Sequence, residues 1–389
     1  MLERVPSEAH PLRAQQRPPF ERTALLLQGG GALGSYQGGV YEALAAANLD
    51  PDWVAGISIG AVNAALIAGN VPGKRIEKLR EFWEAVSTPP LGVPYLKSIT
   101  ITDELIRRFL NQTRALGNLL FGAPNFFTPR LLPPLMWPAE TGSVSYYDVT
   151  PLRSTLDRLV DFDCINSNRM RFSVGAVNVR TGNFIYFDNR THHIGPEHVI
   201  ASGSLPPGFP ATEIEGEYYW DGGLVSNTPL QWMLDNRPQQ DTLAFQVDLW
   251  SADGKLPLNL QEAEVRQKEI QYSSRTRAAT DQFKYAQMLR RAFRQILEHL
   301  PDELRTMPEV AVLAKESDEK VYNIVHLIYH SKRYEGASQD YEFSRRTMEE
   351  HWQAGYDDAV RSLQQPEVWQ RPDNLEGVRT FDYSKKRKD

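Results

Sequence analysis

A serine lies between two glycines in the segment Gly56-Ile-Ser-Ile-Gly60. This spacing matches G-x-S-x-G, in which the serine occupies a sharp turn between a strand and a helix and exposes its hydroxyl for attack on an acyl group. An apolar run at 53–57 precedes Ser58, and an alanine-rich run at 61–68 follows it. Because strand, turn and helix are the context that such a nucleophile requires, we predict that Ser58 is a catalytic nucleophile.

A serine nucleophile also needs hydrogen-bond donors for the negative charge that develops on the substrate oxygen. Residues 25–34 read Leu-Leu-Leu-Gln-Gly-Gly-Gly-Ala-Leu-Gly, an apolar strand that ends in a glycine turn. Glycines allow successive backbone N–H groups to point at one oxygen in front of a helix. We therefore predict an oxyanion hole made by the backbone N–H groups of Gly29, Gly30, Gly31, Ala32 and Ile59.

The same glycines fit a second motif, because residues 29–34 also match the G-x-G-x-x-G of a dinucleotide-binding unit, with Asp50 or Asp52 as its acid. That fingerprint places its acid at the end of the second strand. Asp50 and Asp52 instead precede that strand, and Ser58 occupies its end. The dinucleotide interpretation is therefore disfavoured.

The residue that would activate Ser58 is not fixed by these patterns alone. His326 and His330 share one face of a strand-like run at 321–329 and come late enough for the order Ser, Asp, His of an α/β-hydrolase. They lack the glutamate of H-E-x-x-H, so they do not predict a zinc site. Further along the chain, Asp221 follows an apolar run at 218–220 and starts the tight turn Asp-Gly-Gly.

Three motifs, taken in order, resemble those of the patatin-like phospholipase family. They are the glycine loop at 29–34, the serine turn at 56–60 and Asp-Gly-Gly at 221–223, and the Pro- and Gly-rich segment at 201–210 is also similar. The resemblance covers about residues 22–250. The later part of the chain resembles the C-terminal extension of a bacterial branch of that family.

The resemblance implies an α/β fold, a three-layer sandwich with a mostly parallel central sheet. It also implies a Ser58–Asp221 dyad without histidine, in which Asp221 takes the proton of Ser58 directly. Many family members have Arg or Lys after the glycines, whereas this chain has Ala32 and Leu33, so the oxyanion would be held by backbone donors alone. The motif glycines of the three segments are Gly34, Gly56, Gly60, Gly222 and Gly223.

The implied activity is hydrolysis of the carboxylic ester of a lipid or another long-chain acyl group, of the phospholipase A, lysophospholipase or carboxylesterase type. An acyltransferase shares the same first half-reaction and stays an alternative. A scaffold that keeps the fold without catalysis is the non-enzymatic alternative. No cofactor and no metal is expected.

Composition restricts the class of protein further. The net charge of −6 over 389 residues gives no footprint for nucleic acid. A single cysteine, Cys164, excludes an intramolecular disulfide and a thiolate cluster. Residues 1–21 lack the apolar core of a secretory signal, and no apolar run is long enough to span a bilayer. We expect a cytoplasmic protein that can touch a membrane peripherally and can form a homo-oligomer.

The predicted organisation has three parts: a loose tail at 1–21, a catalytic domain at 22–250, and a helical extension with a further strand at 251–389 that packs on the catalytic domain. Prolines, aromatics and aliphatics alternate within 89–138. This insertion either packs irregularly on the core or forms an apolar cap, with an inner face for an acyl chain and an outer face for a lipid surface.

Overall fold

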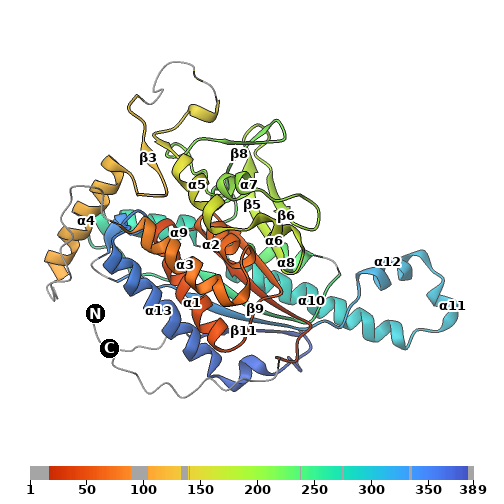
Figure 1. Ribbon diagram of the computed structural model, residues 1–389. Coiled ribbons are helices and arrows are strands. Elements are labelled where there is room, and N and C mark those ends of the chain that lie inside the picture. The colour runs from red at the N-terminus through yellow and green to blue at the C-terminus, as the bar shows by residue number, and fades with distance from the viewer. Residues whose placement is uncertain are drawn as a thin grey trace.

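The computed structural model describes residues 17–88, 104–132, 139, 141–236, 238–273, 276–332 and 335–383. Residues 1–16 of the predicted tail, residues 89–103 and 133–138 of the predicted insertion, and the basic end of the chain at 385–388 lie outside the described residues. The molecule is a mixed α/β structure with helices packed around one central sheet (Figure 1).

The described part of the central sheet is mostly parallel, as predicted, in the order β11-β10-β9-β1-β2-β5-β8-β7, with β6 also paired to β5. The parallel strands are β1 (Arg22–Leu27), β2 (Trp53–Ile57), β5 (Arg171–Asn178), β9 (Thr242–Asp248), β10 (Tyr322–Ile328) and β11 (Val378–Asp382). The antiparallel strands are β6 (Phe184–Asp188), β7 (Thr212–Ile214) and β8 (Glu217–Asp221), and a separate small ribbon pairs β3 (Thr128–Pro129) with β4 (Tyr147–Asp148).

Helices alternate with these strands along most of the chain. The α-helices are α1 (Ser35–Ala46), α2 (Ile59–Ala68), α3 (Pro72–Val86), α4 (Glu104–Phe121), α5 (Thr150–Leu159), α6 (Phe162–Asn166), α7 (Pro196–Ser202), α8 (Leu230–Asp235), α9 (Leu260–Tyr272), α10 (Thr276–Glu298), α11 (Asp302–Arg305), α12 (Pro308–Glu316) and α13 (Arg345–Leu363). Five short 3-10 helices are η1 (Gly31–Gly34), η2 (Thr141–Ser143), η3 (Gly222–Leu224), η4 (Gly336–Ser338) and η5 (Pro366–Trp369). None of the described helices is both long and apolar enough to cross a bilayer.

The core lies on both faces of the sheet, and β1 shows why residues 24–27 form a continuous apolar run. All six residues of β1 are buried. Leu25 and Leu27 join the core cluster that contains α1 and α2, whereas Ala24 and Leu26 join the cluster that contains α8. Side chains alternate between the faces of a strand, so the part of β1 that is covered by apolar clusters on both sides is apolar on both faces.

The C-terminal region continues the central sheet. The strand expected at 321–329 is present as β10, and it pairs in parallel with β9. The sequence analysis missed β11, which pairs with β10. The long helix α13 packs closely on α1, since a Cβ atom on Gly355 would lie 2.0 Å from the backbone oxygen of Tyr36.

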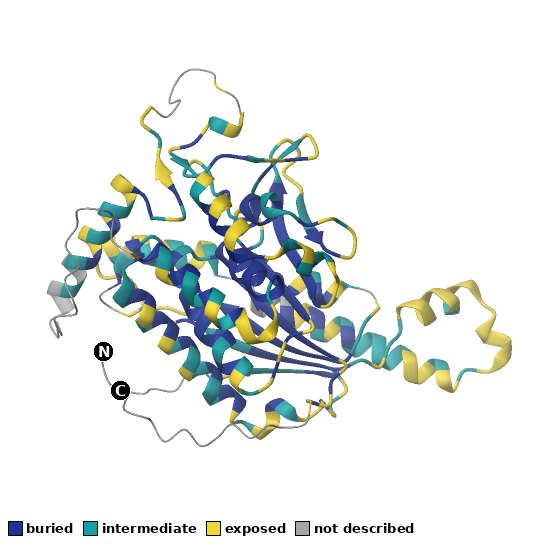
Figure 2. Ribbon diagram, in the orientation of Figure 1, coloured by how far each residue is buried: buried dark blue, intermediate teal, exposed yellow. Residues whose placement is uncertain are grey.

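Two further segments concern the end of α7 and the region that follows α10. The Pro- and Gly-rich segment 201–210 begins within a helix, because Ala201 and Ser202 form the last turn of α7, and the loop begins at Gly203. Helices α11 and α12 have no buried residue and form an exposed arm that extends from the end of α10 (Figure 2).

Candidate active site

Ser58 lies on a strained turn between β2 and α2. Its φ of 55° and ψ of −123° are values that side-chain-bearing residues rarely adopt, and such strain is concentrated at functional sites. The turn needs Gly60, because a Cβ atom there would lie 2.3 Å from the backbone oxygen of Leu27 on β1. The sequence prediction of a serine on a sharp strand-to-helix turn therefore agrees with the local backbone.

A buried serine that the sequence analysis missed supports this turn. The hydroxyl of Ser202, at the end of α7, accepts a hydrogen bond from the backbone N–H of Ser58 at 3.0 Å. The same hydroxyl donates to the backbone oxygen of Gly175 on β5 at 2.6 Å. Ser202 therefore ties the strained turn to the neighbouring strand, and no sequence motif marks it.

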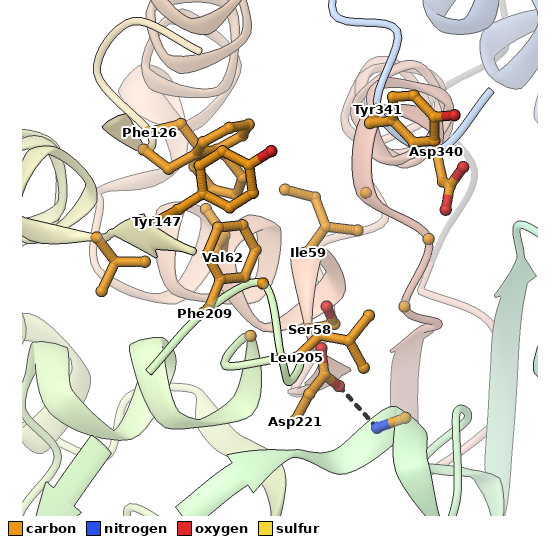
Figure 3. Close-up of a pocket in the computed structure, with 18 of the residues that line it drawn as sticks. Ser58, Ile59, Val62, Phe126, Tyr147, Leu205, Phe209, Asp221, Asp340 and Tyr341 are labelled. Carbon is orange, nitrogen blue, oxygen red and sulfur yellow. Dashed lines mark hydrogen bonds between the residues drawn. The ribbon is translucent and has the colours of Figure 1, made fainter. Parts of the chain in front are cut away.

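Strand register brings Asp221 to the level of Ser58. Ile57 at the end of β2 pairs with Gly175 on β5, and the next residue of β5, Ala176, pairs with Asp221 on β8. The hydroxyl of Ser58 lies close enough to the carboxyl of Asp221 to lower its pKa as a hydrogen-bonding neighbour does. The backbone N–H of Gly223 donates to Asp221 Oδ1 at 2.7 Å (Figure 3). The sheet thus unites two residues that are far apart in the sequence.

The carboxyl of Asp221 is buried, with only 2% of the residue exposed. Burial disfavours the charged form and raises the pKa of Asp221 from its ordinary value of 3.8 to about 7, against the smaller lowering effect of the hydrogen bonds with Ser58 and Gly223. A carboxylate with a pKa near 7 is a much stronger base than a solvated one, and it is matched to proton transfer near neutral pH.

The glycine loop lies next to Ser58, but it offers fewer amide groups than the sequence predicted. The N–H of Gly29 donates to the backbone oxygen of Asn227 at 3.3 Å, and the N–H of Ala32 donates to that of Asp340 at 2.8 Å. These two amides are already engaged in the fold. Within the described part of the chain, the N–H groups of Gly30, Gly31 and Ile59 have no recorded acceptor, so the set of candidate oxyanion donors narrows to these three.

The conformation of Gly31 explains why a glycine is needed in the loop. Its φ is +57°, and a Cβ atom would lie 2.1 Å from the backbone oxygen of Asp340. An L-residue in this left-handed region is disfavoured even where space is available. Here both the backbone and the neighbouring chain exclude a side chain.

Buried polar side chains fix the start of the glycine loop. Gln28 Oε1 accepts hydrogen bonds from the backbone N–H groups of Leu249, at 2.6 Å, and Trp250, at 3.0 Å. The backbone oxygen of Gly29 accepts from Asn227 Nδ2 at 3.0 Å and from Trp250 Nε1 at 3.1 Å. The sequence analysis missed the roles of Gln28, Asn227 and Trp250, although an amide side chain at the end of an apolar strand, as at Gln28, is a usable signal of a buried polar contact.

A cavity of about 320 Å³ opens above Ser58 and Asp221. One side of it is apolar and aromatic, whereas Asp340 and Tyr341 lie on the other side, beyond the glycine loop (Figure 3). The aromatic rings on the apolar side contact one another at centroid distances between 4.8 and 6.3 Å. They belong to Phe126, Phe127, Tyr147, Phe209 and Phe343.

Part of the predicted insertion therefore forms one wall of this cavity, through Leu119, Phe126 and Phe127. The helix α4, which carries Leu119, also exposes apolar side chains to solvent, with exposed fractions of 54% for Leu116, 58% for Leu120 and 65% for Phe121. The described part of the insertion thus has an inner apolar face and an outer one.

The histidine triad is not supported by the structure. His326 lies on β10, which is separated from β1 by β9, and burial lowers its pKa to about 4. No histidine of the described segments lines the cavity. Those segments also contain no cluster of His, Cys, Asp and Glu side chains that could hold a metal ion.

The dinucleotide alternative fails on geometry. Asp52 precedes β2, and its carboxylate accepts from the backbone N–H of Thr23 at the start of β1, at 2.8 Å. Asp50 pairs with Arg75 at 2.9 Å. Both acids therefore lie at the opposite end of the strands from the glycine loop, where they cannot bind a ribose whose phosphates lie on that loop.

Two family models match parts of the chain. Residues 25–234 match the family model described as patatin-like phospholipase, and residues 270–375 match a second model, described as patatin phospholipase. Among solved structures, the chain is similar to VipD from Legionella pneumophila, with 14% sequence identity over 88% of this chain and 67% of that chain and a TM-score of 0.38. No curated protein matches the chain.

The burial of the Asp221 carboxylate, which makes it a stronger base, should also lower the free energy of unfolding at high pH. Its pKa is higher in the folded protein than in the unfolded chain, so the folded state loses stability as the pH rises from about 4 to about 7. Asp221→Asn removes the cost of a buried charge, and we expect it to raise the free energy of unfolding at pH 8 by up to a few kcal/mol. This gain should vanish near pH 4.

Urea unfolding at pH 4, 6 and 8 measures this difference. The exposed Asp157 on α5 provides a control, Asp157→Asn, in which no buried charge is removed. A variant Asp221→Asn that is less stable than the wild type at pH 8 would show that the carboxylate carries no desolvation cost in the folded state.

Proposed function

Because this chain belongs to the patatin-like phospholipase family, whose activity is the hydrolysis of lipid acyl esters, we propose that it cleaves the carboxylic ester of a lipid with Ser58 and Asp221. One observation carries the proposal. The hydroxyl of Ser58 lies beside a buried carboxyl whose pKa is raised to about 7, and both groups line a largely apolar cavity.

In the proposed first step, Ser58 Oγ attacks the carbonyl carbon of the ester while Asp221 accepts the hydroxyl proton. The negative charge then develops on the former carbonyl oxygen, for which the free N–H groups of Gly30, Gly31 and Ile59 are the available donors. Ile59 is also the first residue of α2, so the positive end of the helix dipole faces the same oxygen.

The tetrahedral intermediate then collapses. The bond to the alcohol breaks, Asp221 returns its proton to the leaving oxygen, and the acyl group stays on Ser58. Water enters next, loses a proton to Asp221 and attacks the acyl carbon, and the same proton returns to Ser58 Oγ as the carboxylic acid departs. No cofactor is needed to balance either half-reaction.

The shape of the cavity supports a long acyl chain as the bound part of the substrate. The aromatic wall around Phe126 and Phe209 offers only apolar surface, which favours hydrocarbon over water. The exposed apolar face of α4, defined here as the entrance patch of Leu116, Leu120 and Phe121, adjoins Leu119 of the cavity wall. We propose that this patch contacts the lipid surface from which the substrate is taken.

Replacement of the two reacting residues tests the mechanism. Ser58→Ala and Asp221→Asn should each lower ester turnover by at least about a thousandfold, since nucleophile and base act as a unit. A fluorophosphonate probe should label the wild type and should not label Ser58→Ala. His326→Ala should keep most of the activity, and a loss as large as that of Ser58→Ala in a folded His326→Ala protein would restore the triad.

The pH dependence of the rate tests the role of Asp221 as base. Only its ionised form accepts a proton, so kcat/KM should rise with pH and level off above an apparent pKa near 7. A solvated aspartate would instead give full activity down to about pH 5. A flat profile between pH 5 and 8 would contradict the raised pKa.

Vesicle binding tests the entrance patch. Leu120→Ser combined with Phe121→Ser should weaken vesicle affinity about tenfold, because two apolar side chains lose their burial in lipid. Turnover of a dispersed short-chain ester should stay unchanged. The matched control is Leu304→Ser with Val312→Ser on the exposed arm, where the exposed fractions are 44% and 64%. Equal vesicle affinity in both double variants would exclude α4 as the contact.

A further inference from the structure

A segment from the C-terminal region reaches the glycine loop. The backbone oxygen of Asp340 accepts a hydrogen bond from the N–H of Ala32 at 2.8 Å. It also lies where a side chain on Gly31 would stand, only 2.1 Å from the Cβ position. Residue 340 thus contacts the loop at the two positions that follow Gly30, and it lines the cavity as well (Figure 3).

The side chain of Asp340 is held by a lysine from α9. Lys268 Nζ lies 2.9 Å from Asp340 Oδ1 and 3.0 Å from Oδ2, so it donates to both oxygens of the carboxylate. The same ammonium group lies 5.2 Å from the centre of the Tyr341 ring. Only 30% of the Lys268 side chain and 25% of the Asp340 side chain are exposed, so solvent screens this pair less than a fully exposed one.

The segment is also held from its other side. Asn118 Nδ2 on α4 donates to the backbone oxygen of Tyr341 at 2.9 Å. Asp340 is therefore fixed through its own carboxylate by α9 and through the next peptide by α4. Helices α4 and α9 therefore set the position of residue 340. Because the backbone oxygen of residue 340 accepts a hydrogen bond from Ala32, they also set the position of Ala32.

The glycine loop needs such support from outside. Three successive glycines have a wide choice of backbone conformations, and an amide misplaced by about 1 Å costs a large part of its catalytic effect. Ala32 and Leu33, which follow the glycines, have no polar side chain that could hold the loop. The first anchor of the loop lies at Gly29, through Asn227 and Trp250, and the far end depends on Asp340.

We propose that the Lys268–Asp340 ion pair is a positioning device that holds the Gly30–Ala32 turn in its reactive geometry. The inference rests on the proposed function, because the turn has a reactive geometry only if its N–H groups hold the oxyanion during ester hydrolysis by Ser58 and Asp221. Lys268 also neutralises Asp340. An unpaired carboxylate on the cavity wall would oppose the negative charge of the intermediate.

Kinetics of four variants test this assignment. Lys268→Met should lower kcat about tenfold or more with little change in KM, because the interaction it removes acts on the transition state. Lys268→Arg keeps the charge and should recover most of the rate. Asp340→Asn should lower kcat less than Lys268→Met, since it leaves no unpaired carboxylate. The double variant Lys268→Met/Asp340→Asn should be no slower than Lys268→Met alone.

A matched control exists at the other end of the sheet. Lys320 Nζ donates to both carboxylate oxygens of Glu21, at 2.8 and 2.9 Å, and 33% of its side chain is exposed. Lys320→Met therefore removes an ion pair of the same type far from the glycine loop, and kcat should stay within about twofold of the wild type.

Hydrogen exchange provides a readout that needs no substrate. The amides of residues 28–34 should exchange faster in Lys268→Met and in Asp340→Asn than in the wild type, and their exchange should not change in Lys320→Met.

If the wild type turns over esters but Lys268→Met matches it in both kcat and exchange, this inference is wrong and the proposed function stands. If the wild type neither turns over esters nor reacts with the fluorophosphonate probe, the proposed function fails, and faster exchange in Lys268→Met would still establish the anchor alone.

Discussion

The buried carboxyl of Asp221 is the constraint on which the site depends. A carboxylate becomes a useful base only when water is kept from it, and the fold must then tolerate a charge that the unfolded chain would solvate freely. The register of β5 with β8 places this group beside Ser58, and the N–H of Gly223 is one of the few donors that meet it. Basicity and instability at this position therefore have the same physical origin.

The parts that serve this carboxyl come from the whole length of the chain. The strained turn of Ser58 is supported by Ser202, the glycine loop is fixed at Gly29 by Asn227, and its far end meets Asp340. The region after residue 250 contributes strands β10 and β11 to the central sheet and a backbone acceptor, the oxygen of Asp340, to the glycine loop. This region therefore shares one sheet with the part of the chain that contains Ser58 and Asp221.

The sequence predicted the elements that depend on local patterns. The apolar runs at β1 and β2 and the glycine turns after them could be predicted, because a strand buried on both faces and a sharp turn leave clear residue patterns. The α/β fold class followed from the resemblance of three ordered motifs to a known family. That the amides of Gly29 and Ala32 donate within the fold could not be predicted, since their acceptors, Asn227 and Asp340, are remote in sequence. The sequence analysis also missed Ser202, Gln28 and β11. A single polar contact or an edge strand leaves no repeating pattern of apolar residues in the sequence.

The sheet order has a consequence for how the chain acquires its structure during synthesis. Strand β1 emerges early, but its parallel neighbour β9 follows only about 220 residues later, as the pairing of Arg22 with Thr242 requires. At ribosomal speeds of about 5 to 20 residues per second, one edge of β1 stays unpaired for roughly 10 to 40 s. During that interval the nascent chain exposes an apolar strand edge, a surface on which another chain could pair.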